Sequence, residues 1–130
     1  MSGFCNLGEN ELPRTTQDVR ELDISHMETF SDLNLAYANW EADVKWNVVN
    51  NPVLVQKVDT LCDLYNAEEL AFKAKELGWQ ILSTKRQCHT ALSEGERDGL
   101  VEHVDTLKQL TLQKAVICEA ERRAKEAAHE

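Results

Sequence analysis

The chain of 130 residues is long enough for one domain with its own core and too short for two, and its 5 Gly and 2 Pro favour helices over a turn-rich β fold. The net charge of −9 is concentrated at the start, where residues 1–43 hold nine Asp and Glu against two Arg. An acidic chain of this kind repels phosphate backbones, which argues against nucleic-acid binding, and no run of residues approaches the ~20 apolar residues that span a bilayer.

The cysteine pattern indicates a reducing compartment. The four cysteines, Cys5, Cys62, Cys88 and Cys118, are scattered, and no two of them form a Cys-x-x-Cys pair. The first residues lack the basic region and the apolar run that mark a secretory signal. We therefore expect a cytoplasmic protein with reduced thiols, and the same observations leave a nuclear location open.

Residues 1–14 show no periodicity and are predicted to be a flexible tail, followed by a single helical domain over 15–130. Residues 15–24 could add a short helix. The first strong helix is predicted over 26–49, with Ser25 and Glu28 as a capping box at its start. Residues at alternating spacings of 3 and 4 form a heptad seam, of which all but the last are apolar or aromatic: Phe30, Leu33, Tyr37, Trp40, Val44 and Asn47.

A second helix is predicted over 52–92, because Asn51 can cap it and Pro52 suits its first position. Its seam continues the 3-and-4 spacing through Leu54, Val58, Leu61, Tyr65, Glu68, Phe72, Lys75, Trp79, Leu82 and Arg86. A second apolar line of Leu64, Ala71 and Gly78 widens the stripe, with Leu70, Leu77 and Ile81 nearby. The segment from Asn66 to Glu69 could begin a new helix. The seam keeps its register there, so we predict one continuous helix, with a kink near Asn66 as the alternative.

A third helix is predicted over 94–128, beginning at a capping box formed by Ser93 and Glu96. Short connections between helices favour antiparallel neighbours. The expected fold is therefore all-α, an up-down-up antiparallel three-helix bundle whose long second and third helices form a coiled-coil-like hairpin. The first helix is the shortest, so Ser25 should lie opposite about Lys75, and the hairpin should extend beyond it.

This expected overhang carries apolar side chains that would need to be covered by residues 15–24 or by another protein. Trp46 is a separate candidate, because it lies off the seam of the first helix and exposed tryptophans often mark interfaces. A wide stripe that buries Trp46 is the alternative. We predict that the residues that contact a partner are Trp46, Trp79, Leu82, Leu100, Val104 and Leu107.

The sequence offers little support for catalysis or metal binding. The motif from Glu126 to His129 is a single Glu-x-x-His, whereas a di-iron bundle needs two. Cys88 and His89 are adjacent on a helix and so project about 100° apart, which prevents both from binding one ion. Lys85 and Arg86 could lower the pKa of the Cys88 thiol, but a lone cysteine in a charged helix is usually inert. We predict no catalytic residue, no metal and no cofactor.

These observations predict a non-enzymatic interaction subunit or adaptor of a larger intracellular assembly, such as a cytoskeletal one. Its partner would be another helical protein or a second copy, bound through coiled-coil-type packing without membrane insertion. The polar seam residues Glu68, Lys75 and Arg86 resemble those that set register in coiled coils. The alternative is a self-contained bundle that binds an apolar small molecule among the aromatic residues Tyr37, Trp40, Tyr65, Phe72 and Trp79.

Overall fold

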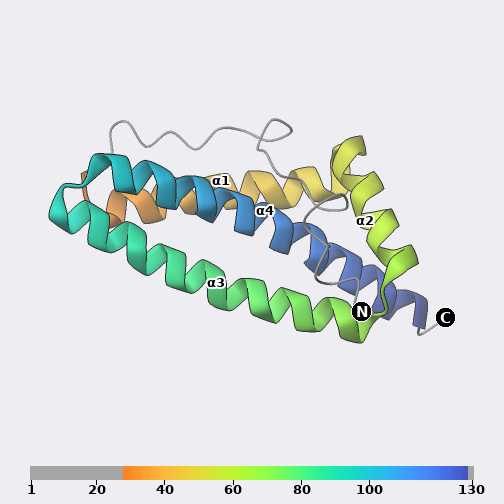
Figure 1. Ribbon diagram of the computed structural model, residues 1–130. Coiled ribbons are helices and arrows are strands. Elements are labelled where there is room, and N and C mark those ends of the chain that lie inside the picture. Colours follow the sequence, from red (N-terminus) through yellow and green to blue (C-terminus); the bar gives the residue numbers. More distant parts are fainter. Residues whose placement is uncertain (1–27, 129–130) are drawn as a thin grey trace.

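The computed structural model describes residues 28–128, and within this range the only regular elements are four helices (Figure 1). Their bounds are α1 Phe30–Asn50, α2 Pro52–Leu64, α3 Ala67–Glu94 and α4 Arg97–Ala128. The predicted all-α class is confirmed, whereas the predicted number of three helices is wrong. The predicted tail over 1–14, the short helix over 15–24 and the cap Ser25 lie outside the described residues.

The start of α1 differs from the predicted one because another capping box is used. The Thr29 hydroxyl accepts a hydrogen bond from the Asp32 amide at 3.1 Å, and the Asp32 carboxylate accepts one from the Thr29 amide at 3.2 Å. Glu28 precedes the helix, and its amide rather than its side chain contributes, donating to the Asp32 carboxylate at 3.2 Å. The predicted seam of α1 is confirmed in its middle, where Leu33, Tyr37, Trp40 and Val44 are buried. Phe30 and Asn47 at its ends are half-buried, and Val48 is buried in addition.

The predicted second helix is broken at Tyr65 and Asn66, which gives the fourth helix. Both residues have extended backbones, at φ −134° and ψ 149° for Tyr65 and φ −87° and ψ 171° for Asn66. The Asn66 side chain accepts a hydrogen bond from the Glu69 amide at 2.9 Å, and the Glu69 carboxylate accepts one from the Asn66 amide at 3.1 Å. This reciprocal box satisfies two amides that a helix start leaves without partners, so the break is stable.

The break also decides which side of α3 faces the core. The predicted seam holds in α2, which buries Leu54, Val58 and Leu61. Beyond Asn66 the predicted seam is wrong, since α3 buries the opposite side of the helix. That buried line repeats at alternating spacings of 4 and 3 and consists of Leu70, Ala74, Leu77, Ile81, Thr84, Cys88 and Ala91.

The α3–α4 connection is a glycine turn and not the predicted capping box. Gly95 adopts φ 71° and ψ 22°, in the left-handed region, and ends α3. The Glu96 amide donates to the Ala91 carbonyl at 2.9 Å, which closes the turn. Ser93 therefore belongs to the last turn of α3, and α4 starts at Arg97 instead of residue 94.

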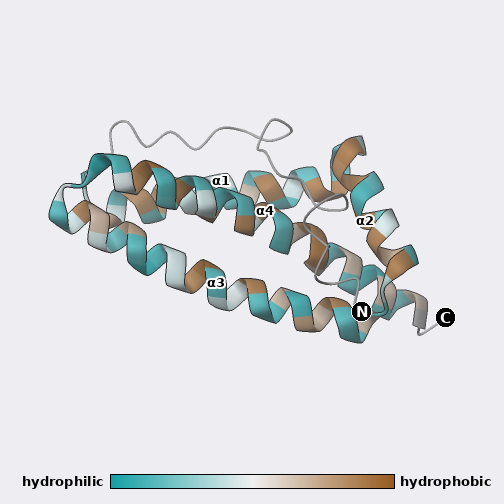
Figure 2. Ribbon diagram, viewed as in Figure 1, coloured by the Kyte–Doolittle hydropathy of each residue, from teal (hydrophilic) through white to brown (hydrophobic). Residues whose placement is uncertain are grey.

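The helices α1, α3 and α4 lie along one another, and α2 crosses the end of the molecule remote from the α3–α4 turn (Figure 1). The chain runs in the same direction in α1 and α4 and in the opposite direction in α3. Hydrophobic residues occur along all four helices, interspersed with polar ones (Figure 2). One continuous core joins the buried residues of all four.

The overhang expected from the sequence is absent because α1 reaches the tip of the α3–α4 hairpin. The Phe30 ring packs edge-on against the His89 ring, with 4.7 Å between centroids. Residues at the start of α1 thus lie beside the end of α3, and not beside its middle near Lys75. Because α2 crosses the end of the bundle remote from the α3–α4 turn, α3 starts at that end. It then runs back alongside α1 towards the turn.

Candidate interaction surfaces

Thiol and metal chemistry find no support in the described part of the chain. Residues 28–128 contain no group of three or more His, Cys, Asp or Glu side chains placed to hold a metal ion. Cys88 is buried, and burial raises the pKa of its thiol to about 11, so the neighbouring cations of α3 do not activate it. Burial also raises the pKa values of the Cys62 and Cys118 thiols. All three thiols are therefore protonated near neutral pH and are poor nucleophiles.

The six residues predicted to contact a partner fall into two groups. The side chains of Trp46, Trp79 and Leu82 are exposed by 62%, 65% and 42%. The side chains of the other three, Leu100, Val104 and Leu107, are each only 1% exposed. They belong to the core between the long helices, because α1 covers the hairpin tip. These three residues are therefore core residues, and the prediction that they contact a partner is wrong.

The five aromatic residues predicted to surround a small molecule do not share a pocket. Tyr37 and Trp40 are buried, with their ring centroids 6.1 Å apart. The Tyr37 hydroxyl shares a 2.7 Å hydrogen bond with the Thr111 hydroxyl. Tyr65 is half-buried near the helix break, and Phe72 and Trp79 lie on the exposed side of α3. The five side chains are therefore spread over the core, the helix break and the outer side of α3, and they do not surround one site.

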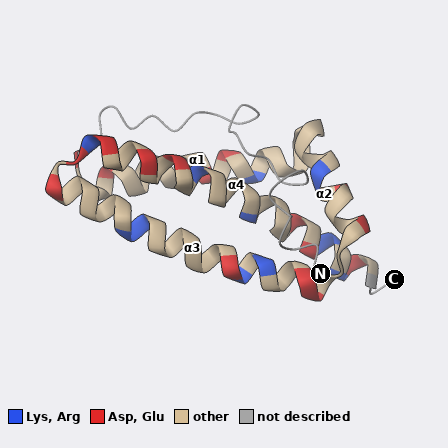
Figure 3. Cartoon of the chain, in the orientation of Figure 1, with Lys and Arg blue, Asp and Glu red and all other residues tan. Residues whose placement is uncertain are grey.

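The side of α1 that faces away from the core is apolar. We call it the α1 outer face, and it comprises the exposed residues Leu35, Ala38, Ala42, Trp46 and Val49. The spacings of 3, 4, 4 and 3 keep these residues on one side of the helix. From residue 34 to residue 50, Lys45 is the only charged residue among those that are exposed. Figure 3 shows long uncharged stretches along α1.

A groove of about 440 Å³ adjoins this face, between α1 and α4. Its apolar lining includes Val48 and Ala115, and Val49 belongs to both the groove and the α1 outer face. Lys45 and Lys114 also line the groove, and neither makes an ion pair with another residue in the range 28–128. The groove therefore presents two lysines together with the Glu41 carboxylate, and Glu119 and Arg122, which pair with each other, complete its charged lining.

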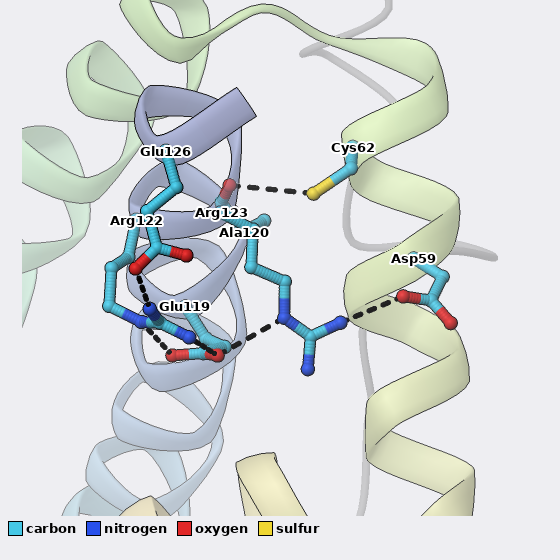
Figure 4. Close-up of polar contacts among 7 residues, drawn as sticks. All are labelled: Asp59, Cys62, Glu119, Ala120, Arg122, Arg123 and Glu126. Atoms are coloured by element: carbon cyan, nitrogen blue, oxygen red, sulfur yellow. Dashed lines mark hydrogen bonds and ion pairs between the residues drawn. The ribbon is translucent and has the colours of Figure 1, made fainter. Parts of the chain in front are cut away.

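An ion-pair network fixes the end of the groove nearest α2 (Figure 4). The Arg123 guanidinium contacts the Glu119 carboxylate at 3.1 Å and reaches across to the Asp59 carboxylate of α2 at 2.8 Å. Arg122 also binds Glu119, at 2.6 Å, and its hydrogen bonds lower the pKa of the Glu119 carboxyl group. The Cys62 thiol donates to the Ala120 carbonyl at 3.4 Å in the same region. These contacts hold α2 against α4.

A second exposed strip, in which charged residues are interspersed with large apolar ones, runs along the outer side of α3. We call it the α3 outer line, and it consists of Glu68, Phe72, Lys75, Trp79, Leu82 and Arg86, all of them exposed. These six residues belong to the seam that the sequence predicted to be buried. Basic and acidic residues occur toward both ends of α3, and its central stretch carries no charge (Figure 3). Thus α3 has a heptad-like line on each of two opposite sides.

Sequence reasoning missed most of the α1 outer face. It singled out Trp46 but not Leu35, Ala38, Ala42 or Val49. The signal in the sequence was the scarcity of charged residues on the side of this helix opposite its seam. The solvent-exposed side of an amphipathic helix normally carries charged residues.

Comparisons with known proteins assign no family to this chain: no protein-family model, curated protein or solved structure matches it. Within residues 28–128, none of the helices combines the length and apolarity that crossing a membrane requires.

Proposed function

We propose that this protein is a non-enzymatic interaction subunit or adaptor that binds a helix of another protein along α1. The observation that supports this most strongly is the α1 outer face, which exposes Leu35, Trp46 and Val49 beside a single fully exposed charge, Lys45, while Glu41 and Asp43 are half-buried at its flanks. Contiguous apolar surface of this kind is uncommon on a protein that acts alone and typically marks an interface.

The same molecule shows how a solvated helix differs from α1. The exposed side of α4 carries many charges, among them Arg97, Asp98, Glu102, Asp105, Arg122, Lys125 and Glu126. Both helices belong to one bundle and both bury a complete seam, so the contrast lies in their outer sides. Selection for solubility alone explains the outer side of α4 but leaves that of α1 unexplained.

The chemistry of the surface favours an amphipathic helix as the partner. Large side chains at Leu35 and Trp46 bracket two alanines, Ala38 and Ala42, and this alternation lets a second helix pack its ridge into the depression between them. The lysines of the adjoining groove, among them Lys45, would attract acidic residues on the partner's flank. We expect this role to be exercised in the cytoplasm, where the thiols stay reduced.

Affinity capture with matched variants tests the proposal. Wild-type protein, Trp46→Ala and Trp79→Ala serve as baits, because the two tryptophans are almost equally exposed but lie on different helices. A captured protein lost only with Trp46→Ala is then purified, and its affinity is measured by calorimetry. Removal of an interface tryptophan should weaken binding by about thirtyfold or more.

The control is the affinity of the same purified partner for Trp79→Ala, which should equal that of the wild type. A partner that binds Trp46→Ala as tightly as the wild type would contradict binding along α1. Failure of every captured protein to bind once purified would contradict the proposed function itself.

A further inference from the structure

The α3 outer line has the same pattern of spacings in both directions. Its members lie at positions 68, 72, 75, 79, 82 and 86, so the spacings are 4, 3, 4, 3 and 4. Such a line alternates between the two core positions of a heptad repeat. When two helices of this kind pack antiparallel, each core position of one lies opposite the other core position of its partner. A second copy of α3 can therefore meet the first in register.

The side chains paired in this way are complementary. A two-fold axis midway between Lys75 and Trp79 places Glu68 opposite Arg86 of the second copy. It places Phe72 opposite Leu82 and Lys75 opposite Trp79. Each type of pair then occurs twice, by symmetry.

Each pair makes a favourable contact. Glu68 and Arg86 have opposite charges at the two ends of the line, where their carboxylate and guanidinium can form an ion pair. Phe72 and Leu82 would bury apolar surface that is now 67% and 42% exposed. Lys75 opposite Trp79 brings an ammonium group to an indole ring, which is the most favourable ring for a cation–π contact.

We propose that the α3 outer line is a self-association surface on which a second copy of this chain docks antiparallel about a two-fold axis. The opposite arrangement is disfavoured by the same residues. In a parallel, in-register pair each residue would face the same residue of the second copy. Glu68 would then face Glu68, Lys75 would face Lys75 and Arg86 would face Arg86, so that like charges repel at all three positions.

The flanks of the line are compatible with this packing. Ala71 and Gly78 lie beside it on one side, where Ala71 is small enough to allow close approach and the Lys114 side chain of α4 lies next to Gly78. Glu76 lies on the other side, near the axis, where its counterpart in the second copy would repel it. Its carboxylate already contacts the Lys73 ammonium at 2.8 Å, which reduces that repulsion.

The size of the surface implies a weak and reversible dimer. The line from Glu68 to Arg86 extends over only ~27 Å of helix. Packing of two single helices over this length buries less surface area than a stable protein–protein interface does. We expect a dissociation constant on the order of 10–100 μM. The protein would then be a monomer when dilute and a dimer where it is locally concentrated, as on a larger assembly.

Sedimentation equilibrium of the full chain tests for the dimer, over roughly 1 μM to 1 mM, a range that brackets the expected constant. The apparent mass should rise from 14.8 kDa towards twice that value. Trp79→Ala should weaken association by about thirtyfold or more, since each dimer loses two tryptophans. A wild-type chain that stays monomeric throughout the range would overturn the proposal, including the case in which residues 1–27 occupy the α3 outer line.

Charge exchange tests the antiparallel pairing. Glu68→Lys or Arg86→Glu alone should weaken association by about tenfold, because each places like charges opposite each other twice in the dimer. The double variant E68K/R86E should restore association, and so should an equimolar mixture of the two single variants. Circular dichroism of the dilute proteins verifies that each variant is folded. Absence of rescue in both cases would overturn the antiparallel arrangement.

Trp46→Ala is the matched control and should dimerise like the wild type. Equal weakening by Trp46→Ala and Trp79→Ala would place the dimer interface elsewhere and overturn the assignment to α3. The outcome is separable from the partner proposed for α1, because each surface has its own tryptophan variant that leaves the other surface intact.

Discussion

Tyr37 is the residue at which three helices meet through specific contacts. Its hydroxyl group in α1 shares a hydrogen bond of 2.7 Å with the Thr111 hydroxyl of α4. The Lys85 ammonium of α3 lies 4.4 Å from the centre of the Tyr37 ring. Both hydroxyls are buried, and burial raises the pKa of Tyr37 to about 12. A buried hydroxyl pair of this kind fixes one arrangement of the helices, because any shift would leave both groups without partners.

Thr111→Val should therefore lower the free energy of unfolding by about 1–3 kcal/mol, because it leaves the Tyr37 hydroxyl buried without its partner. Urea denaturation measures the change. Thr106→Val is the matched control on the same helix, since the Thr106 hydroxyl is exposed and bonds only to the Glu102 carbonyl one turn earlier. Its effect should stay within about 0.5 kcal/mol.

A double-mutant cycle completes the test. If the two hydroxyls act as a pair, adding Tyr37→Phe to Thr111→Val should cost less than the sum of the two single changes. Strict additivity would show that the hydrogen bond does not couple α1 to α4.

At the level of the elements, the two residues that separate α2 from α3 determine more of the fold than any seam does. The sequence contains the reciprocal pattern of Asn66 and Glu69, but the unbroken 3-and-4 spacing across it favoured one helix. Periodicity alone cannot show which side of α3 is buried, because the lines of residues on its two opposite sides have the same alternating spacings of 3 and 4. Composition can: the buried line has Thr84 as its one polar member, whereas the outer line includes Glu68, Lys75 and Arg86.

Helix starts were predicted less well than helix seams for a similar reason. Several segments have the form of a capping box, and the tertiary structure decides which of them is used. Ser93 and Glu96 match the pattern, but Gly95 between them accommodates a left-handed turn and ends the preceding helix there. The length of each helix, and hence which apolar residues are covered, depended on these starts. For this reason the burial of Leu100 could not be anticipated.

Two glycines near the α3–α4 turn allow a direct test of the turn geometry. Gly95→Ala should lower the free energy of unfolding by about 1 kcal/mol, because φ of 71° is costly for a residue with a side chain. Gly99→Ala is the control, within α4 with space around it, since an added Cβ would meet only the flexible Glu96 side chain at 3.7 Å. That change should stabilise the protein by up to about 1 kcal/mol.

Thermal denaturation of both variants measures the two effects. Equal destabilisation by Gly95→Ala and Gly99→Ala would show that the connection does not depend on the left-handed conformation.

For the molecule as a whole, the architecture divides into a long α3–α4 hairpin, flanked by α1, and a short crossing helix. The 13 residues of α2 are held at one end of the bundle by Leu54, Val58 and Leu61, and by the exposed ion pair of Asp59 with Arg123. A helix this short has little stability of its own. It depends on the contacts at its buried side, whereas α3 and α4 support each other over their whole length.

Amide hydrogen exchange should therefore show that α2 opens more readily than the hairpin. The amides of α2 should exchange at least about tenfold faster than those in the middle of α3 and α4, because local opening of α2 exposes less apolar surface than global unfolding does. Exchange followed by mass spectrometry of peptic fragments measures this difference. Equal protection of α2 and the hairpin would mean that the four helices open only as one unit.

The heptad-like spacing on both sides of α3 makes its orientation sensitive to the length of the chain that precedes it. Insertion of two residues just after Asn66 would rotate the helix by about 200° relative to its cap, and would turn Phe72 and Trp79 inward while Leu70 and Leu77 moved to solvent. The rotated helix would still be amphipathic, but it would bury charges. The number of residues between the cap at Asn66 and Leu70 thus determines which of the two similar stripes of α3 is buried in the core. The other stripe remains exposed and available to other molecules.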